Sequence, residues 1–438
     1  MDIVIMIAQL LLGISILVGL HELGHLIAAK AFGMRVEKYS IGFPPKIIGF
    51  KKGETEYSLG AIPLGGFVKI SGMVDESLDT KSLHEAPQSW EFRSKPAWQR
   101  LIVMLGGIIV NVITGIIIFI SLLFIFGETY ISSKEGNKYG VVPNELGKKI
   151  GIQEGDKIVK INGKDYTNFA EIWSPDVLLN SNSSLTIERK GEISTIAIPE
   201  KFINEFSDKK TGGPFVDPIS EFKVGKVIKK TGAEKAGLKK GDKIVEVNAI
   251  PIHFFHELQH VLHANKNKDL PIVIEREGIR STLQAHINEN GELGFEAERK
   301  IDLSTTHYSL LQAIPKGTAM AFTIIWVNAK GLAKVITGKV SPTKSLSGPI
   351  GIAQIFGGQW NWQNFWRITG LLSMVLAFMN FLPIPALDGG HVMFLTYEII
   401  SGRKPSDKFL EIATKIGMVI LIGLMLFAIF NDILKSFF

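Results

Sequence analysis

The sequence predicts a polytopic α-helical membrane protein with four transmembrane helices and inserted β-rich segments. The first observation is a set of apolar runs, each long enough to cross about 30 Å of hydrocarbon. The second is an internal repeat in the polar segment between the second and third runs. The third is an alternating apolar and polar stretch that favours a β-hairpin. The apolar runs span about 3–29, 101–126, 366–387 and 412–430.

Composition supports a mixture of membrane and soluble parts. The chain has 438 residues, of which 21% are charged, and its mean hydropathy is +0.22. It has no cysteine, so disulfides are excluded and any zinc must be held by nitrogen and oxygen ligands. The net charge of +6 is modest, and no basic stripe is interleaved with aromatic residues. Nucleic acid is therefore not an expected partner.

The first apolar run contains the string His21-Glu22-Leu23-Gly24-His25. On a helix, HExxH places two imidazoles one turn apart on one face, with a carboxylate beside the metal as general base. The string is short, but ionisable residues in a membrane-length apolar run are costly and usually mark function. The longer string of one soluble class needs Gly and His where this chain has Ala28 and Ala31. A third ligand must therefore be sought elsewhere.

Asp388 is the best candidate for that ligand. It is the only acid at the end of the run 366–387, where two prolines break the helix and two glycines allow a tight turn. Glu54 and Glu56 are alternatives, but both lie in a polar, turn-rich stretch. A helix end with an acid in a glycine-rich turn is the simpler interpretation of Asp388 alone. Pairing with HExxH favours a catalytic zinc site with one position open for water.

Together the two motifs resemble those of the site-2 protease family of intramembrane zinc metalloproteases, most closely its sigma-E-regulating branch. The family's N-x-x-P-x-P-x-L-D-G motif stands at 380–389, and the resemblance covers essentially the whole chain. It implies that His21, His25 and Asp388 bind zinc and that Glu22 is the catalytic base. It also implies that the motif residues Asn380 and Pro383 contact the substrate.

The resemblance implies an endopeptidase that cleaves single-span membrane proteins within or near the transmembrane segment. The expected substrate is an anti-sigma factor in envelope-stress signalling, and the expected location is the bacterial inner membrane. Two other classes are weighed against this one. A non-enzymatic membrane scaffold has no need for His21, Glu22, His25 and Asp388 together, and a metal transporter would spread its ligands along a transmembrane path.

The internal repeat aligns 151–163 with 237–249 at a constant offset of 86, with seven identical pairs. Each copy predicts a turn, an alternating strand and a second turn. The repeated string resembles that of the bacterial, circularly permuted PDZ domain, which implies a first PDZ domain over 127–210 and a second over 211–300. Such domains can bind exported peptide tails by strand addition. Acting only as a size filter is the alternative, and the two roles are compatible.

The stretch 55–72 alternates apolar and polar residues around a Pro-x-Gly-Gly turn. It resembles the family's membrane-associated β-hairpin. An unpaired edge beside the zinc could hold an unwound substrate helix as an added strand, so Gly65, Gly66 and Phe67 are candidate substrate-binding residues. A purely structural hairpin is the alternative.

Charge predicts the topology. The loop 30–100 is rich in Lys and Arg, so it is expected in the cytoplasm, with both termini and the PDZ domains in the periplasm. The active site then lies near the cytoplasmic side. The apolar segment within 301–345 is interrupted by lysines and predicts an amphipathic helix on membrane lipid. The membrane core is divided into 1–126 and 346–438.

Overall fold

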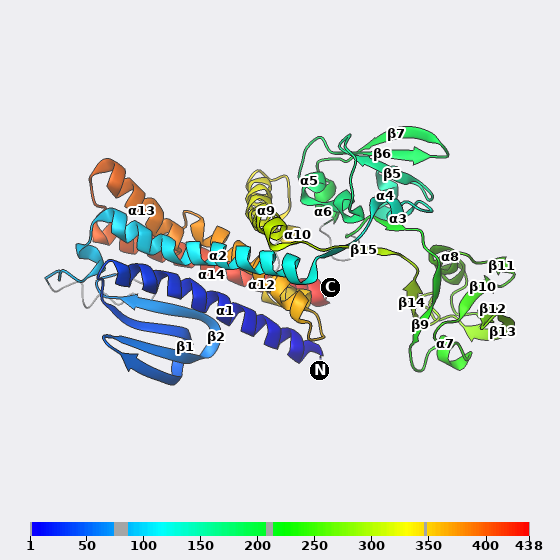
Figure 1. Cartoon of the computed structure of the whole chain (residues 1–438), viewed down its shortest axis with the longest axis horizontal. Helices are drawn as coiled ribbons and strands as arrows, with labels where there is room; N and C mark the ends of the chain where they lie inside the picture. Colours follow the sequence, from blue (N-terminus) through cyan, green and yellow to red (C-terminus); the bar gives the residue numbers. More distant parts are fainter. Residues whose placement is uncertain (1, 74–85, 207–212, 346–347, 438) are drawn as a thin grey trace. The chain divides into compact units, whose positions relative to one another are not determined.

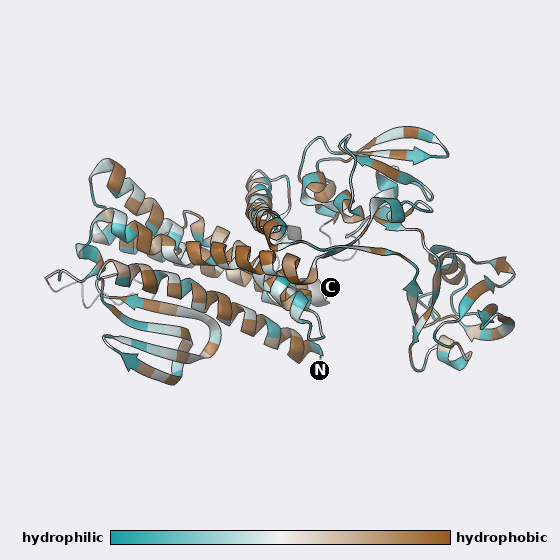
Figure 2. Cartoon of the chain, in the orientation of Figure 1, coloured by the Kyte–Doolittle hydropathy of each residue, from teal (hydrophilic) through white to brown (hydrophobic). Residues whose placement is uncertain are grey.

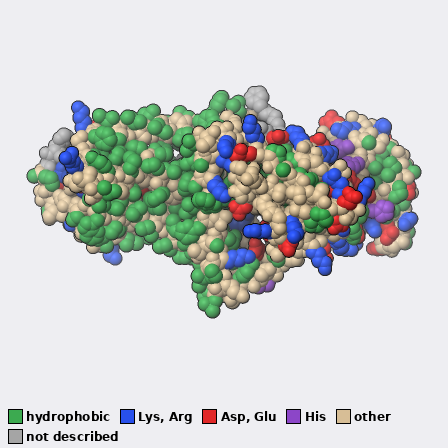
Figure 3. All heavy atoms as spheres, turned by 90° about the horizontal axis from the view of Figure 1, so that it is seen from above, with side chains coloured by type: hydrophobic (Ala, Val, Ile, Leu, Met, Phe, Trp, Pro, Cys, Tyr) green, Lys and Arg blue, Asp and Glu red, His purple; other side chains and the backbone are tan. Residues whose placement is uncertain are grey.

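A computed structural model describes residues 2–73, 86–206, 213–345 and 348–437. The chain divides into a helical unit, formed by Met1–Glu128 and His307–Phe438, and a β-rich unit, formed by Thr129–Thr306. Figure 3 shows hydrophobic side chains over the helical unit and many charged side chains over the β-rich unit.

The helical unit is built around α2, which contacts four other helices of the unit (Figure 1). Its partners α1, α9, α12 and α13 come from both ends of the sequence, while the short α11 contacts α1, α12 and α14. The helices of this unit are α1 (Asp2–Ala31), α2 (Ala97–Phe126), α9 (Leu310–Ile336), α10 (Pro342–Ser345), α11 (Pro349–Phe356), α12 (Trp362–Phe381), α13 (Asp388–Ser401) and α14 (Asp407–Phe437).

Glycines allow α2 to approach its neighbours closely. A Cβ atom added to Gly106 would lie 2.6 Å from the carbonyl oxygen of Gly24 on α1. A Cβ added to Gly317 of α9 would lie 2.7 Å from the backbone nitrogen of Ile120 on α2. Small residues at such crossings let apolar helices pack through backbone contact, as is common in membranes. The HExxH segment is therefore held directly against α2.

Four described helices are long and apolar enough to cross a membrane, namely α1, α2, α9 and most of α14. Figure 2 shows the apolar residues along these helices. Exposed side chains on them include Ile3, Ile117, Ile125 and Val419, as expected of surfaces that face lipid. The sequence predicts instead a span over 366–387 and a surface helix over 311–336. The 27-residue α9 meets the length and hydropathy requirement, whereas the first two turns of α12 contain Gln363, Asn364 and Arg367.

Two elements near the site differ from their predicted bounds. The third apolar run leaves the helix after Phe381, not after Leu387, because Pro383 and Pro385 cannot donate helical hydrogen bonds. Asp388 is consequently the first residue of a new helix, α13. The hairpin turn lies at Gly53 and Glu54, not at Pro63–Gly66, and Gly53 adopts the left-handed φ of 64° that favours glycine.

The hairpin strands β1 (Val36–Lys52) and β2 (Thr55–Ile70) are long and bent. Segment 36–41 of β1 pairs with segment 66–70 of β2 on one side and with segment 55–59 of β2 on the other. Segment 55–59 also pairs with segment 48–52 of β1. The two strands therefore form a sheet of four segments beside α1 (Figure 1). Segment 66–70 is an outer segment of this sheet.

The β-rich unit contains two similar sequences of elements, which follow the internal repeat. In the first, β4 pairs with β8, and β5, β6 and β7 form a sheet. In the second, β9 pairs with β14, and β11, β10, β12 and β13 form a sheet. The first copy contains β4 (Val141–Pro143), α4 (Glu145–Lys149), β5 (Lys157–Ile161), η3 (Phe169–Trp173), α5 (Pro175–Leu178), β6 (Ser184–Arg189), β7 (Glu192–Ala197), α6 (Phe202–Phe206) and β8 (Val216–Pro218).

The second copy contains β9 (Phe222–Val227), α7 (Gly232–Lys235), β10 (Lys243–Val247), β11 (Ile250–Pro251), α8 (Phe255–Ala264), β12 (Asp269–Arg276), β13 (Ile279–His286) and β14 (Phe295–Arg299). At the two ends of the unit, β3 (Glu128–Ile131) pairs with β15 (Leu303–Thr306). The short α3 (Ser133–Gly136) follows β3, and the short η2 (Phe92–Ser94) precedes α2 in the helical unit.

The Gly-Asp pair of the repeat has the same structural role in both copies. Arg189 donates two hydrogen bonds to the carboxylate of Asp156, at 2.8 and 2.7 Å. Arg276 donates two to Asp242, both at 2.7 Å. In each copy the aspartate lies in the turn just before one strand, β5 or β10, and the arginine lies on the strand that pairs with it, β6 or β12. The bidentate pair therefore holds the turn against the neighbouring strand. The repeat in sequence is thus a repeat in structure.

The first copy extends past its predicted end. The boundary expected between 210 and 211 lies outside the described residues, but Phe215 and Val216 are buried in the core of the first copy. The strand β8, which contains Val216, pairs with β4. The copies therefore meet near Pro218. The boundary expected between 345 and 346 borders residues that are also not described.

Candidate active site

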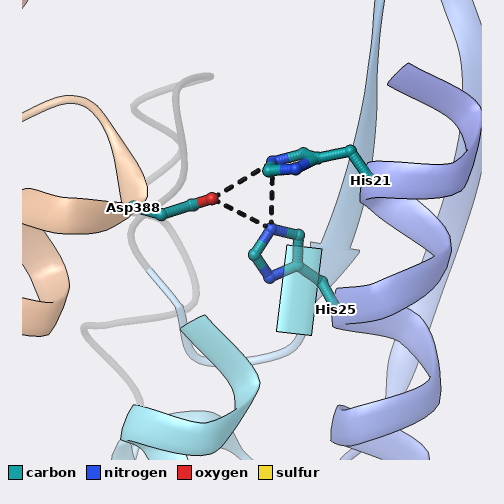
Figure 4. A group of neighbouring side chains, drawn as sticks. All are labelled: His21, His25 and Asp388. Atoms are coloured by element: carbon teal, nitrogen blue, oxygen red, sulfur yellow. Dashed lines mark hydrogen bonds and ion pairs between the residues drawn. The ribbon is translucent and has the colours of Figure 1, made fainter. Parts of the chain in front are cut away.

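Three side chains from two distant parts of the sequence meet inside the helical unit. Nε2 of His21 lies 3.1 Å from Oδ2 of Asp388, and Nε2 of His25 lies 3.3 Å from the same oxygen. The two Nε2 atoms are 3.3 Å apart. Figure 4 shows both rings projecting from α1 toward the carboxylate at the start of α13. All three side chains have little exposed surface.

Glu22 lies beside this group in a cavity of about 420 Å³. The cavity is bounded by α1, the outer segment of the sheet, α2 and the α12–α13 connection. It is lined by His21, Glu22, His25, Phe43, Pro44, Gly66, Phe67, Val68, Ile70, Met73, Met104, Asn380, Ala386, Leu387, Asp388 and His391. A carboxylate, three potential ligands and mainly apolar walls therefore share one cavity.

Contacts behind the imidazoles fix the rings. Nδ1 of His25 lies 2.8 Å from the carbonyl oxygen of Val103 on α2. A carbonyl oxygen only accepts, so Nδ1 carries the hydrogen and Nε2 is the nitrogen that faces Asp388. In the neutral form of the ring, the lone pair on Nε2 is then available to a metal. Nδ1 of His21 lies 3.1 Å from the amide nitrogen of Asn111, also on α2. Both rings are thus oriented by the neighbouring helix.

The donor atoms fit a divalent metal such as zinc. The ligand atoms of His21, His25 and Asp388 all lie within 4.8 Å of one another. Oδ2 of Asp388 is buried without a hydrogen bond of standard geometry, and so is Oδ1 of Asn111. Exchanging the amide atoms of Asn111 would let Nδ1–H of His21 donate to Oδ1, which leaves Nε2 free as a ligand. Two nitrogens and one oxygen are a ligand set that zinc accepts.

The connection that presents Asp388 is tightly built. Ala386 adopts a φ of 101°, which is unusual for a residue other than glycine. A Cβ added to Gly390 would lie 2.6 Å from the carbonyl oxygen of Ile384, so only glycine fits there. Short-range packing of this turn therefore sets the direction of the carboxylate.

The predicted substrate-binding residues lie at different distances from the group. The amide nitrogen of Asn380 is 3.2 Å from Nε2 of His21, and Gly66 and Phe67 line the cavity. Gly65 and Pro383 do not line it. A Cβ on Gly65 would collide with the ring of Phe43, and Pro383 is exposed.

Several residues that line the cavity or support the site were given no role there from the sequence. Asn111 contacts His21, and Met104, Phe43 and His391 line the cavity. The sequence does contain a signal for Asn111, because it is a fully buried polar residue within a 30-residue apolar helix. His391 follows Asp388 by three residues, one helical turn on the same face.

Two imidazoles and a carboxylate that can hold a metal ion lie beside a further carboxylate, next to long apolar helices. This combination defines the class of membrane metalloproteases. Comparison with known proteins agrees with this class. The chain belongs to peptidase family M50, whose family model matches residues 9–424.

Relatives align over nearly the full chain. The regulator of sigma E protease of Haemophilus influenzae is 30% identical over 458 residues, covering 98% of each chain. A Rickettsia conorii protein, provisionally named a zinc metalloprotease, is 31% identical and covers 97% of each chain. The regulator of sigma-E protease of Escherichia coli is 27% identical, covering 97% of this chain and 98% of its own. The protein is therefore a zinc metalloprotease with membrane helices.

Proposed function

We propose that this zinc metalloprotease cleaves single-span membrane proteins within or near their transmembrane segment. The observation that carries the proposal is the convergence of His21, His25 and Asp388 in a cavity that also contains Glu22. An anti-sigma factor is the proposed natural substrate, because relatives are named regulators of sigma E. The bacterial inner membrane is the proposed location.

His21, His25 and Asp388 are proposed to hold the zinc, which when bound polarises water and the scissile carbonyl. Glu22 accepts the proton of the attacking water and delivers it to the leaving amine. Asn380 lies beside Nε2 of His21, where its amide N–H can donate to the oxygen that gains charge. Val103 and Asn111 keep the two imidazoles in the orientation that this chemistry requires.

The edge of β2 is proposed to hold the scissile segment in an extended form. Residues 66–70 pair with 36–41 on one side, and Gly66, Phe67, Val68 and Ile70 line the cavity. A transmembrane helix hides its carbonyl groups in its own hydrogen bonds, so cleavage requires local unwinding. Strand addition at this edge would supply replacement hydrogen bonds for the unwound residues.

The proposal also assigns each part of the chain to one side of the membrane and gives the β-rich unit a role in substrate selection. The positively charged segment 30–100 is assigned to the cytoplasm, and both termini and the β-rich unit to the periplasm. The two repeats are proposed to be PDZ domains that bind exported peptide tails or restrict the size of substrates. The exposed apolar side chains Ile47, Ile48 and Phe50 of the hairpin are assigned to contact with membrane lipid.

Cleavage of a single-span protein tagged at both ends tests the proposal in detergent, with wild type and Glu22→Gln compared. We expect wild type alone to produce two fragments, with mass spectrometry locating the new termini within or near the span. Helix-breaking residues placed in the span should accelerate cleavage. Equal cleavage by Glu22→Gln would contradict the role of Glu22. New termini far outside the span would contradict the proposed substrate class.

A further inference from the structure

The β-rich unit contains a second HExxH string. It reads His256-Glu257-Leu258-Gln259-His260 and lies on α8. Four of the ten histidines of the chain, His253, His256, His260 and His263, fall in or just before this helix. His256 and His260 are separated by four residues, so their side chains lie one turn apart on one face.

The two imidazoles are arranged much as in the first string. The rings of His256 and His260 have centroids 5.9 Å apart and an interplanar angle of 84°. The rings of His21 and His25 have centroids 4.9 Å apart and an angle of 83°. In both pairs the edge of one ring points at the face of the other. Among the described residues only the active-site group has all its ligand atoms within 4.8 Å of one another, so the exposed ring of His260 must turn about its side-chain torsions to bind an ion together with His256.

A carboxylate from the other repeat reaches this pair. Oε1 of Glu154 lies 3.0 Å from Nε2 of His256. The side chain of His256 is only 8% exposed, whereas that of Glu154 is 50% exposed and can adjust. Glu154 belongs to the repeated string of the first copy, and the aligned residue of the second copy is Lys240. Of the two copies of the repeat, the first has a carboxylate at this position, and this carboxylate contacts α8 of the second copy.

The glutamate of this second string is engaged elsewhere. Oε2 of Glu257 accepts hydrogen bonds from the backbone N–H groups of His253 and Phe254, at 2.7 and 3.0 Å. It caps the first turn of its own helix, whereas Glu22 lines a cavity beside its histidines. The second string thus retains metal-binding side chains without a free general base.

We propose that His256, His260 and Glu154 bind a second zinc ion, which joins the two repeats of the β-rich unit. Two imidazoles and one carboxylate are the same ligand types as in the active site and suit zinc. Water supplies the remaining coordination on the exposed side. Without the ion, His256 and Glu154 form an ion pair between the two copies. With the ion bound, Glu154 of the first copy and both imidazoles of the second copy coordinate the same atom, so the relative motion of the copies is restricted. This inference does not depend on the proposed proteolytic function.

Zinc content of the full-length protein tests the second site. The protein is purified in detergent with a tag that contains no histidine, equilibrated with a zinc buffer and analysed by elemental mass spectrometry. We expect two zinc ions per chain in wild type and one in His260→Gln. His260 is exposed, so its replacement preserves the fold. Glu154→Gln should weaken the second site at least about tenfold, as loss of even an outer-shell partner does.

His286→Gln is the matched control. His286 is an exposed histidine of the same repeat whose Nδ1 lies 2.9 Å from Oδ1 of Asp269. Within the described part of the chain, His286 makes no ring contact with a second imidazole, whereas His256 and His260 contact one another. This variant should retain two zinc ions, and zinc should raise the melting temperature of its β-rich unit as it does for wild type. In His260→Gln the remaining zinc ion lies in the helical unit, so zinc should leave the melting temperature of the β-rich unit unchanged. One zinc ion in wild type, or two in His260→Gln, would overturn the proposal and leave His256 and Glu154 as a simple ion pair.

Discussion

Asn111 on α2 lies 3.1 Å from Nδ1 of His21 on α1, on the side of the ring opposite the one that faces Asp388. The position of the first ligand therefore depends on a helix that contributes no ligand itself. Partners of this kind fix the tautomer and direction of metal-binding imidazoles.

Replacing Asn111 by leucine should weaken zinc binding about 10–100-fold, because His21 loses the group that orients its ring. Competition with a chelator of known affinity measures the change. Asn328→Leu is the control, since the amide of Asn328 donates to Ile324 of its own helix at 2.8 Å. Unchanged zinc affinity in Asn111→Leu would show that His21 needs no support from α2.

Gly107 should be the glycine of α2 whose replacement most directly disturbs the ligands. A Cβ at this position would lie 2.5 Å from Nε2 of His25 and 2.6 Å from Cε1 of His21. Gly107→Ala should therefore lose most of its active-site zinc and its proteolytic activity, as measured by metal content and substrate cleavage. Gly423→Ala, where no atom lies within 4 Å of the added carbon, should keep both.

A buried ion pair holds α13 against α2. Nη2 of Arg100 lies 2.5 Å from Oε1 of Glu398, and the side chains are 8% and 17% exposed. Arg100→Met would leave Glu398 buried without its partner, which costs about 3–5 kcal/mol in comparable pairs. Because α13 begins at Asp388, we expect both a lower melting temperature and faster zinc release.

Lys415→Met provides the comparison for this pair. Lys415 and Glu411 form an ion pair within α14 whose side chains are 55% and 40% exposed. Exposed pairs contribute little, so this variant should behave as wild type. An Arg100→Met protein with unchanged thermal unfolding and zinc release would refute the anchoring role of the pair.

The second repeat should lose stability in acid through Asp242. Burial alone would raise the pKa of Asp242, but hydrogen bonds from Arg276 and from the backbone of Lys239 outweigh it and lower the pKa. The folded pKa is thus below the unfolded value of about 3.9, so the contribution is present above that pH and is lost as pH falls through the folded pKa.

Thermal unfolding of the β-rich unit within the full chain, followed from about pH 5 to about pH 3, measures this contribution. Asp242→Asn should unfold at lower temperature than wild type near neutral pH, and its stability should depend less on pH. Asp269→Asn, which replaces a 76% exposed carboxylate, should follow the wild-type curve. Identical pH dependence of wild type and Asp242→Asn would assign the acid sensitivity to other groups.

The ligands and the base could be predicted because each belongs to a short motif with a fixed chemical purpose. HExxH defines His21, Glu22 and His25 through helical spacing, and Asp388 stands out as an acid at the end of an apolar run. Family membership and the metalloprotease class confirm the functional prediction at that level. The individual roles of these residues remain predictions.

Supporting contacts could not be predicted in the same way. Asn111 and the Val103 carbonyl reach the histidines only because Gly24 and Gly106 bring two helices together, and no local pattern defines which faces meet. The hairpin turn was placed wrongly because Pro63 and the following glycines are typical of turns. They instead lie in β2, part of which is an outer segment of the sheet, and sheets tolerate proline in edge strands.

Anomalous diffraction at the zinc edge would show whether His21, His25 and Asp388 hold one zinc ion together. We expect a peak between the two Nε2 atoms and the carboxylate in wild type. We also expect loss of this peak in Asp388→Asn, with α1 and α13 otherwise in place. A zinc peak at the histidines that persists unchanged in Asp388→Asn, or no peak there in wild type, would contradict this shared site.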